Sequence, residues 1–294
     1  MASGAHRMGE VEVERLAHGY GLIEGPVWVA GRGLLFSDVH GGGVYCLDAA
    51  GAVATVFPHR RGIGGMAVHE RNGVVVGGRN IAYKSFEGGE TVVLLDRNPD
   101  GGNVGYNDLT TDAAGRVYAG SLGSPVFEGT EQKPGDLYLI DLDGTGRIVA
   151  RDVQLTNGLG FSPDGRTLYH SDSRRQTVFC YAAGDEGDLG PKEAFARTQG
   201  GAPDGLAVAE DGSVWVAVAG GSGVDVFEPG GGLRDHIGIP MPMCTSVCFG
   251  GDDLRDLYIV TGSGGVAGER EGSVFRIRTD VAGLPVPEAR VPLG

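Results

Sequence analysis

The sequence is poor in cysteine and tryptophan, with 4 and 2 of these residues among 294. Cys46, Cys180, Cys244 and Cys248 lie in or beside short apolar runs, so we expect free, buried thiols in place of disulfides. Cys244 and Cys248 have a C-x3-C spacing, but no second Cys or His pair lies nearby to complete four ligands. The cysteines therefore predict no metal site.

Basic residues are also scarce, because 24 Lys and Arg stand against 38 Asp and Glu and give a net charge of −14. Nucleic acids and anionic membranes attract basic surfaces, so this charge disfavours both as partners. No stretch reaches the roughly 18 apolar residues of a membrane-spanning helix. The first ten residues lack the apolar centre of a signal peptide. We therefore expect a cytoplasmic protein with a small-molecule partner.

Glycine, in contrast, is abundant, and 55 glycines punctuate a recurring phrase. The phrase begins at a polar residue and ends at a turn eight positions later, as in Asn107–Gly115, Asn157–Gly165 and Asp204–Gly212. A copy at Gly65–Gly73 lacks the polar residue, and looser copies begin at Glu24 and Thr245. The starts recur about every 40 to 50 residues, which is the period of four-stranded propeller blades.

Each copy is followed by short apolar runs between Gly, Asp and Asn clusters, which is typical of strands joined by tight turns. The second runs of the six units are residues 33–38, 73–78, 115–121, 166–172, 212–218 and 256–262. No linker interrupts the array. The sequence predicts one all-β domain over 1–294, a six-bladed β-propeller whose repeats cover about 15–278. Residues 11–17 are expected to add the outer strand of the blade that contains residues 272–278.

The innermost strand of each propeller blade lines the central channel, so residues at the same phase meet around one axis. That position holds Glu24, Gly64 or Gly65, Asn107, Asn157, Asp204 and Thr245. Two carboxylates at one axis repel each other and are costly to desolvate unless a cation lies between them. Oxygen ligands favour a hard ion, so we predict a metal site in the channel for Ca²⁺, Mg²⁺ or Mn²⁺. Asn and Asp are common in turns anyway, so the prediction depends on their shared phase.

The loops that follow the second strand of each blade return to the same face and are expected to overlook this site. They contain Asp38, His40, Arg79, Ser121, Ser124, His170 and Asp172. For His170 the alternative is a hydrogen bond inside its strand. Residues 141–152 match the ligand spacing of an EF-hand, but strand-like flanks stand where helices are required. A β-turn is the better interpretation of that segment.

Several phrases together resemble the gluconolactonase and regucalcin (senescence marker protein) family of metal-dependent lactonases. They are EGPVW (24–28), YND (106–108), NGLGFSPDGRTLY (157–169), PDGLAV (203–208) and TSVCFGG (245–251). The resemblance implies a six-bladed propeller that binds one divalent metal and hydrolyses lactones. It implies Glu24, Asn157 and Asp204 as metal ligands, Asp204 as the proton acceptor, and Asn107 as a contact to the substrate or to a metal-bound water. Calcium is the expected ion, with zinc, manganese or magnesium as alternatives.

Two departures concern the substrate. Sugar-lactone members of the family resemble one another in an Arg where this chain has Gly105, and in an acidic residue close to the position of Ser124. We therefore predict a lactone that need not be a sugar, contacted by Asn107, Ser124, His40 and His170. Segment 123–135 is expected to cover the mouth as a lid, and its Val126 and Phe127 favour a less polar ligand.

Two other functions fit the same pattern. In one, the ion only braces the channel and no reaction occurs. In the other, the scaffold performs phosphotriester hydrolysis or a lyase or condensation step, since a fold does not fix the chemistry. The proton acceptor also stays open, because metal ligation lowers the basicity of Asp204. The other candidates for a proton relay are Asp38, His40, His170 and Asp172.

Overall fold

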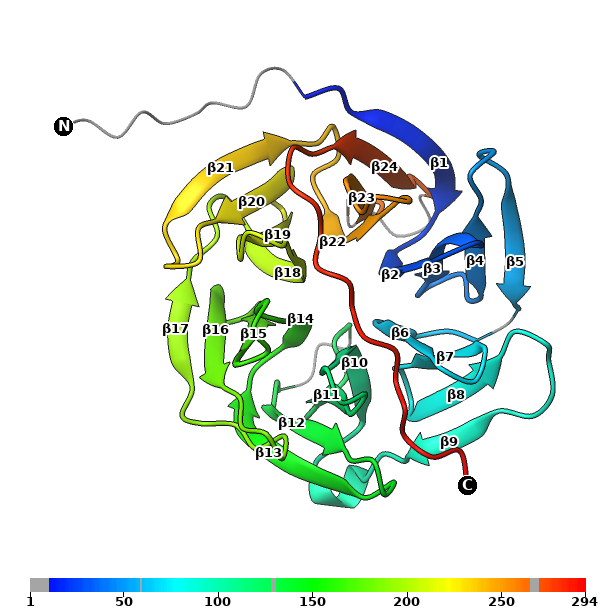
Figure 1. Ribbon diagram of the computed structural model, residues 1–294, viewed down its shortest axis with the longest axis vertical. Coiled ribbons are helices and arrows are strands. Elements are labelled where there is room, and N and C mark those ends of the chain that lie inside the picture. The colour runs from blue at the N-terminus through cyan, green and yellow to red at the C-terminus, as the bar shows by residue number, and fades with distance from the viewer. Residues whose placement is uncertain (1–10, 59, 128–130, 265–269) are drawn as a thin grey trace.

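The computed structural model describes residues 11–58, 60–127, 131–264 and 270–294. Over these ranges the chain forms six four-stranded antiparallel sheets that surround a central axis (Figure 1). This arrangement confirms the six-bladed propeller. The first ten residues and part of the expected lid, residues 128–130, lie outside the described ranges.

Blades 1 to 3 follow one another along the chain, each from its innermost to its outermost strand. Blade 1 contains β2 (Ile23–Val29), β3 (Gly33–Asp38), β4 (Val44–Leu47) and β5 (Val53–Phe57). Blade 2 contains β6 (Met66–His69), β7 (Gly73–Val76), β8 (Ile81–Ser85) and β9 (Val92–Leu95). A short 3-10 helix, η1 (Pro99–Gly101), leads to blade 3, which contains β10 (Gly105–Thr111), β11 (Val117–Leu122), β12 (Gly135–Ile140) and β13 (Gly146–Val153).

Blades 4 and 5 have the same order, and blade 6 combines both ends of the chain. Blade 4 contains β14 (Thr156–Phe161), β15 (Thr167–Asp172), β16 (Thr177–Ala182) and β17 (Glu193–Ala196). Blade 5 contains β18 (Ala202–Val208), β19 (Val214–Ala219), β20 (Gly223–Phe227) and β21 (Leu233–Gly238). Blade 6 contains β22 (Cys244–Gly250), β23 (Asp256–Thr261), β24 (Gly272–Arg278) and, outermost, β1 (Glu14–Tyr20).

The ring closes through backbone pairing between β1 and β24. These strands run antiparallel, with Glu14 opposite Arg276 and Tyr20 opposite Gly272. The outer strand expected from the N-terminal run is thereby confirmed. Because β1 continues into β2 of blade 1, the hydrogen bonds of this pair hold the first and last blades together.

The hydrophobic core lies between neighbouring blades. Each cluster of buried residues combines side chains of two adjacent sheets, as where Trp215 of blade 5 packs edge-on against Phe249 of blade 6 at 5.5 Å. Trp28 of blade 1 stacks on Tyr258 of blade 6 at 5.6 Å. Middle strands are covered on both faces, which is why runs such as residues 33–38 are buried throughout and do not alternate between buried and exposed.

Turn residues predicted from the sequence end the strands as expected. Residues 141–146 form the hairpin between β12 and β13, with the N–H of Gly144 donating to the carbonyl of Asp141 at 2.9 Å. The β-turn interpretation of the EF-hand-like segment is therefore confirmed. All four cysteines are free thiols, and Cys244 is the one that is buried.

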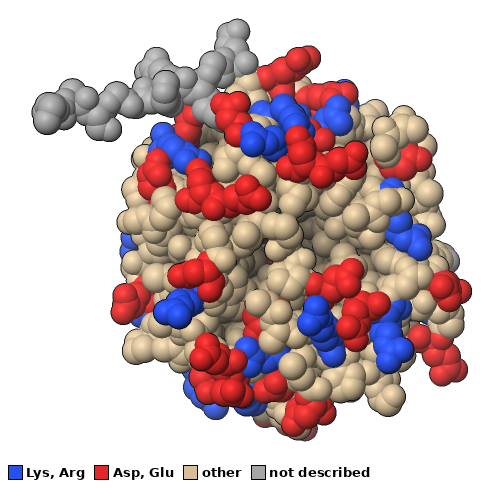
Figure 2. Space-filling model, viewed as in Figure 1, with Lys and Arg blue, Asp and Glu red and all other residues tan. Residues whose placement is uncertain are grey.

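After β24 the chain crosses one end of the channel, the end that faces the viewer in Figure 1, where the segment is red. This end is called the rear of the propeller, and residues 279–294 are called the rear tail. Along this rear tail the N–H groups of Leu284, Ala289 and Arg290 donate to carbonyls of Val208, Val68 and Gly115, each at 2.8 Å. A cavity of about 530 Å³ lies between the tail and the inner strands. Figure 2 shows this face hollowed and uncharged at its centre, with charged side chains around it.

No helix of the described ranges is long and apolar enough to span a membrane.

Candidate metal and substrate site

Irregularities in the inner strands set the direction of the predicted site residues. The pairing of each inner strand with its neighbour shifts register at the predicted position, between Glu24 and Val27 in β2 and between Pro203 and Leu206 in β18. The same shift brackets Asn107 in β10 and Asn157 in β14. Bulges of this kind re-aim a side chain that regular alternation would place on a sheet face. The position that repeats in the sequence is therefore a β-bulge in the inner strand of each of these blades.

Glycine next to the site residue lets neighbouring inner strands approach closely. A Cβ added at Gly158 would lie 2.3 Å from the backbone nitrogen of Leu206, and one added at Gly205 would lie 2.6 Å from the Cα of Ser246. Side chains at these positions do not fit beside the next strand. The Asn-Gly and Asp-Gly pairs of the sequence are therefore packing requirements of the ring.

Blade 2 lacks a polar site residue because blade 3 fills its place. A Cβ added at Gly64 would lie 2.0 Å from Oδ1 of Asn107, and one added at Gly65 would lie 2.3 Å from Oδ1 of Asp108. Blade 3 departs from the usual polar-Gly pair by having Asp108 where the other blades have glycine or serine. Its two side chains occupy the space over the two glycines of blade 2.

Hydrogen bonds fix the amide of Asn157. Its Oδ1 accepts from Nδ2 of Asn107 at 2.6 Å, while its Nδ2 donates to Oγ of Ser173 at 2.7 Å. The hydroxyl of Ser173 donates in turn to the carbonyl of Pro203 at 2.6 Å, next to Asp204. Because an amide oxygen has two lone pairs, Oδ1 of Asn157 keeps one for a further partner.

Burial raises the pKa values of the three carboxyl groups in the channel. The pKa of Glu24 lies well above its usual value because of burial, and the charges of Asp204 and Asp108 add to that effect. Burial and then the charge of Asp108 raise the pKa of Asp204. Desolvation raises the pKa of Asp108 to about 7. Ionising these carboxyl groups therefore costs free energy unless a positive charge lies beside them.

These residues fit a hard divalent cation. Oδ1 of Asp204 is buried and has no hydrogen-bond partner among the described residues. Together with Glu24 and Oδ1 of Asn157 it makes a set of two carboxylates and one amide oxygen. In the described part of the chain no three Asp, Glu, His or Cys side chains are placed to hold a metal ion, so a site here would combine two carboxylates with an amide oxygen. Oxygen donors suit Ca²⁺, Mg²⁺ and Mn²⁺ better than a metal that prefers thiolate.

Other predicted residues lie at the front mouth, the end of the channel opposite the rear tail. The exposed ring of His40 meets Phe127 edge-on at 5.2 Å, so a residue of the expected lid contacts the loop of blade 1. Ser124 is buried at the start of the expected lid segment, 123–135, where its hydroxyl donates to Oε1 of Gln132 at 3.0 Å and accepts from the N–H of Lys133. In this arrangement the hydroxyl of Ser124 holds the loop.

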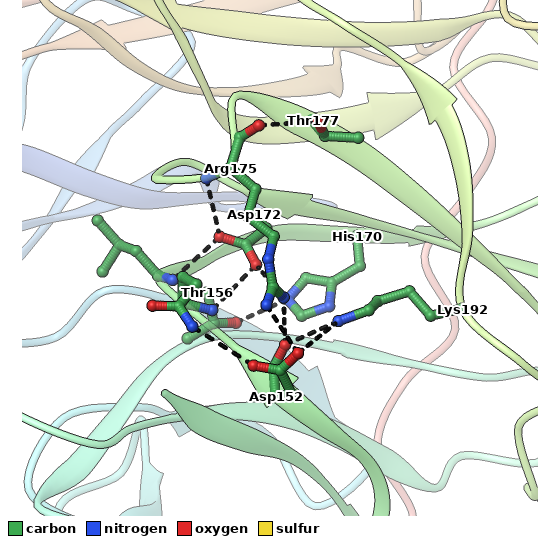
Figure 3. A network of polar contacts seen from close by, with 9 residues as sticks. Asp152, Thr156, His170, Asp172, Arg175, Thr177 and Lys192 are labelled. Carbon is green, nitrogen blue, oxygen red and sulfur yellow. Dashed lines mark hydrogen bonds and ion pairs between the residues drawn. The ribbon is translucent and has the colours of Figure 1, made fainter. Parts of the chain in front are cut away.

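His170 and Asp172 belong to a polar network between blades 3 and 4 (Figure 3). His170 is 1% exposed, and its Nε2 lies 2.8 Å from Oγ1 of Thr156. Asp172 accepts from the N–H groups of Gln154 and Leu155 and pairs with Arg175 at 3.3 Å. Both side chains are used within the protein, and the position of His170 favours the structural alternative that the sequence left open.

Comparison with known proteins decides the family. The sequence pattern described as the SMP-30/gluconolactonase/LRE-like region matches residues 22–263. The chain belongs to this family. It is 34% identical over 279 residues to the 6-deoxy-6-sulfogluconolactonase of Pseudomonas putida, which covers 90% of this chain and 94% of that one.

Two further family members agree. The regucalcin of Gallus gallus is 30% identical over 283 residues, covering 90% of this chain and 94% of that one. The solved structure of a gluconolactonase from Xanthomonas campestris superposes with a TM-score of 0.79 and 25% identity, covering 93% and 91% of the two chains. The family is thus one of lactonase-type hydrolases, which cleave carboxylic esters.

Sequence reasoning missed two residues of this family member's site. Asp108 follows Asn107 and was not singled out, although its replacement of the usual glycine was visible in the repeat. Ser173 lies in a loop 16 residues after Asn157, and no spacing in the sequence connects the two. Its role emerges from the fold alone.

Proposed function

We propose that the protein is a divalent-metal-dependent lactonase whose ion is held by Glu24, Asn157 and Asp204. The observation that carries this proposal is the buried Oδ1 of Asp204, which has no hydrogen-bond partner among the described residues, together with the fixed amide oxygen of Asn157. Leaving such a carboxylate unpaired costs free energy, and a cation removes that cost. The oxygen-only donors make Ca²⁺ the first candidate, followed by Mg²⁺, Mn²⁺ and Zn²⁺.

The residues of the chain have separate tasks in ring opening. A bound divalent cation supplies positive charge that polarises the lactone carbonyl and makes water more acidic. Asp204 would accept the proton of the attacking water at the carboxylate oxygen that does not bind the ion. Asn107 and Ser173 keep Asn157 in one orientation, and His40 and Phe127 border the mouth through which the lactone enters.

The substrate class we propose is a lactone of a sugar acid. Relatives that cover most of this chain carry the names sulfogluconolactonase and gluconolactonase, which supports this class. The sequence alone favoured a less polar lactone, because Gly105 and Ser124 lack the charged groups of sugar-lactone members. The described mouth combines the apolar Phe127 with polar loops, so both classes belong in the test.

The test is turnover by metal-stripped protein that is resupplied with single ions. Gluconolactone, an aliphatic lactone and a phosphotriester are the substrates, and Asp204→Ala is compared with Asp143→Ala, an exposed carboxylate on the β12–β13 turn. We expect ion-dependent opening of a lactone that only Asp204→Ala abolishes. Equal turnover by both variants contradicts the assignment of Asp204. If the ion raises stability but no substrate is turned over, the ion only braces the channel. If only the phosphotriester is hydrolysed, the protein is a phosphotriesterase and not a lactonase.

A further inference from the structure

Three arginines gather at the front mouth on the side of blade 2. Arg60 and Arg61 lie in the loop between β5 and β6, and Arg79 follows β7. Nη2 of Arg60 donates to Oδ1 of Asn80 at 3.0 Å and to its carbonyl at 3.3 Å, which ties the first loop to the second. The stem of Arg61 crosses Gly42 of blade 1. The three side chains thus start from loops that are held together.

The position of this arginine cluster relates directly to the proposed site. Gly77, two residues before Arg79, is in contact with the carbonyl of Asn107, since a Cβ added there would lie 2.2 Å from that oxygen. The loop of Arg79 therefore starts beside Asn107, and the long side chain of Arg79 is within reach of a ligand bound there.

Gly105 of β10 packs against the loop that carries Arg79. A Cβ added at Gly105 would meet the carbonyl of Gly78 at 3.0 Å and the Cα of Arg79 at 3.8 Å. The N–H of Gly78 donates to the carbonyl of Tyr106 at 3.0 Å, and the N–H of Tyr106 donates to the carbonyl of Gly78 at 2.7 Å. The loop of Arg79 is therefore bonded to the strand that carries Asn107.

The cluster has no counter-charge among the described residues. Within these ranges none of Arg60, Arg61 and Arg79 has a carboxylate oxygen within 4.0 Å. Arg60 is half-buried, and its partners in the described part of the chain are the neutral oxygens of Gly77 and Asn80. Guanidinium groups on neighbouring loops without a carboxylate favour an anion, and a guanidinium can donate two parallel N–H bonds to its oxygens.

We propose that Arg60, Arg61 and Arg79 form a subsite for an oxyanion, such as a sulfonate or a phosphate, at the end of the lactone remote from its ring carbonyl. This inference rests on the proposed lactonase function for its substrate but not for the binding of the anion. It replaces the expectation of a less polar ligand by a lactone that carries a charged end group.

The experiment compares gluconolactones that differ only at C6, carrying hydroxyl, sulfonate or phosphate. Wild-type protein is expected to have a KM about tenfold lower for a charged lactone than for the uncharged one, which corresponds to about 1.4 kcal/mol. The double variant Arg61→Gln/Arg79→Gln is expected to lose that difference, with a larger change in KM than in kcat. Arg166→Gln, an exposed arginine on the β14–β15 turn at the rear of the propeller, is the matched control. The sulfonate and phosphate arms decide which oxyanion is preferred.

A binding measurement separates this inference from the proposed function. Calorimetric titration with 6-deoxy-6-sulfogluconate and with gluconate requires no turnover. If the sulfonated acid binds more tightly than gluconate and the double variant loses this difference, the subsite is supported, even when no lactone is turned over. The lack of turnover would overturn only the lactonase function. Equal binding of both acids, or equal KM values for all three lactones, overturns the subsite.

Discussion

The hydroxyl of Ser173 connects Asn157 of blade 4 to blade 5. It accepts from Nδ2 of Asn157 at 2.7 Å and donates to the carbonyl of Pro203 at 2.6 Å. The amide nitrogen is therefore anchored away from the channel, and Oδ1 is presented to it. Partners that orient a metal ligand in this way commonly determine the affinity of the site as much as the ligand itself.

We expect Ser173→Ala to weaken metal binding by about 10- to 100-fold, because the amide of Asn157 is then free to turn. Calorimetric titration of metal-stripped protein with Ca²⁺ measures the change. Ser162→Ala is the control, since Ser162 makes comparable hydrogen bonds to Asp164 and Thr167 on the turn at the rear of the same blade. If Ser173→Ala binds the ion as tightly as the control, the hydroxyl does not position the ligand.

The close packing of blade 3 over Gly65 of blade 2 leads to a prediction about stability. A methyl group at Gly65 would meet Oδ1 of Asp108 at 2.3 Å and the backbone nitrogen of Leu109 at 2.6 Å, so the inner strands of blades 2 and 3 must separate. We expect Gly65→Ala to lower the free energy of unfolding by about 1–3 kcal/mol, as overpacking does elsewhere. Urea unfolding measures it. Gly230→Ala has open space around the new methyl group and is expected to be neutral; equal midpoints for the two variants would contradict the packing argument.

Gly64 and Gly65 of blade 2 also show how far the sequence could predict the site. The ring of Glu24, Asn107, Asn157 and Asp204 follows from a repeat, because equal phase in equal blades places residues around one axis. In that ring the repeat shows only that blade 2 has glycine, Gly64 or Gly65, where other blades have a polar residue. Only the fold shows that side chains of the next blade occupy the position, since such contacts join segments about 40 residues apart and leave no periodic signal.

Loop residues were harder to predict than strand residues for a related reason. Asp38, His170 and Asp172 lie near the end of the second strand of their blades, toward the front of the molecule, as expected. Their polar atoms, however, are buried and bonded to groups of the protein. Asp38 accepts from the N–H groups of Gly21, His40 and Gly41. Whether a polar residue near a mouth binds a ligand or ties a loop depends on local backbone donors, which sequence patterns do not specify.

The rear tail is expected to stabilise the ring. It joins blades on opposite sides of the channel through its hydrogen bonds to Val208, Val68 and Gly115, and it buries Ala289 and Val291 against blades 2 and 3. Removal of residues 284–294 should lower the free energy of unfolding by about 2–4 kcal/mol, because each lost bond contributes roughly 1 kcal/mol and the apolar burial adds to them. Removal of residues 292–294 alone is the control, and an equal urea midpoint for both truncations would show that the tail is not a brace.

Acid is expected to destabilise the protein through His170. Burial lowers the pKa of this imidazole from 6.5 to about 3, so the folded protein keeps it neutral while the unfolded chain binds a proton below pH 6.5. The unfolded state then holds more protons between pH 6.5 and pH 3, and stability must fall as the pH falls through that window. Between pH 7 and pH 5 the loss from this group is about 2 kcal/mol.

Urea unfolding of wild-type protein and His170→Gln at both pH values isolates that contribution. Glutamine keeps a polar partner for Thr156 but does not titrate, so we expect the variant to lose about 2 kcal/mol less than wild type on acidification. His18→Gln, which replaces an exposed histidine of β1, is the matched control. The carboxyl groups of the channel have raised pKa values and act in the opposite direction, but they are common to all three proteins and cancel in the comparison. Parallel pH profiles for wild type and His170→Gln would mean that His170 is protonated equally in the folded and unfolded states.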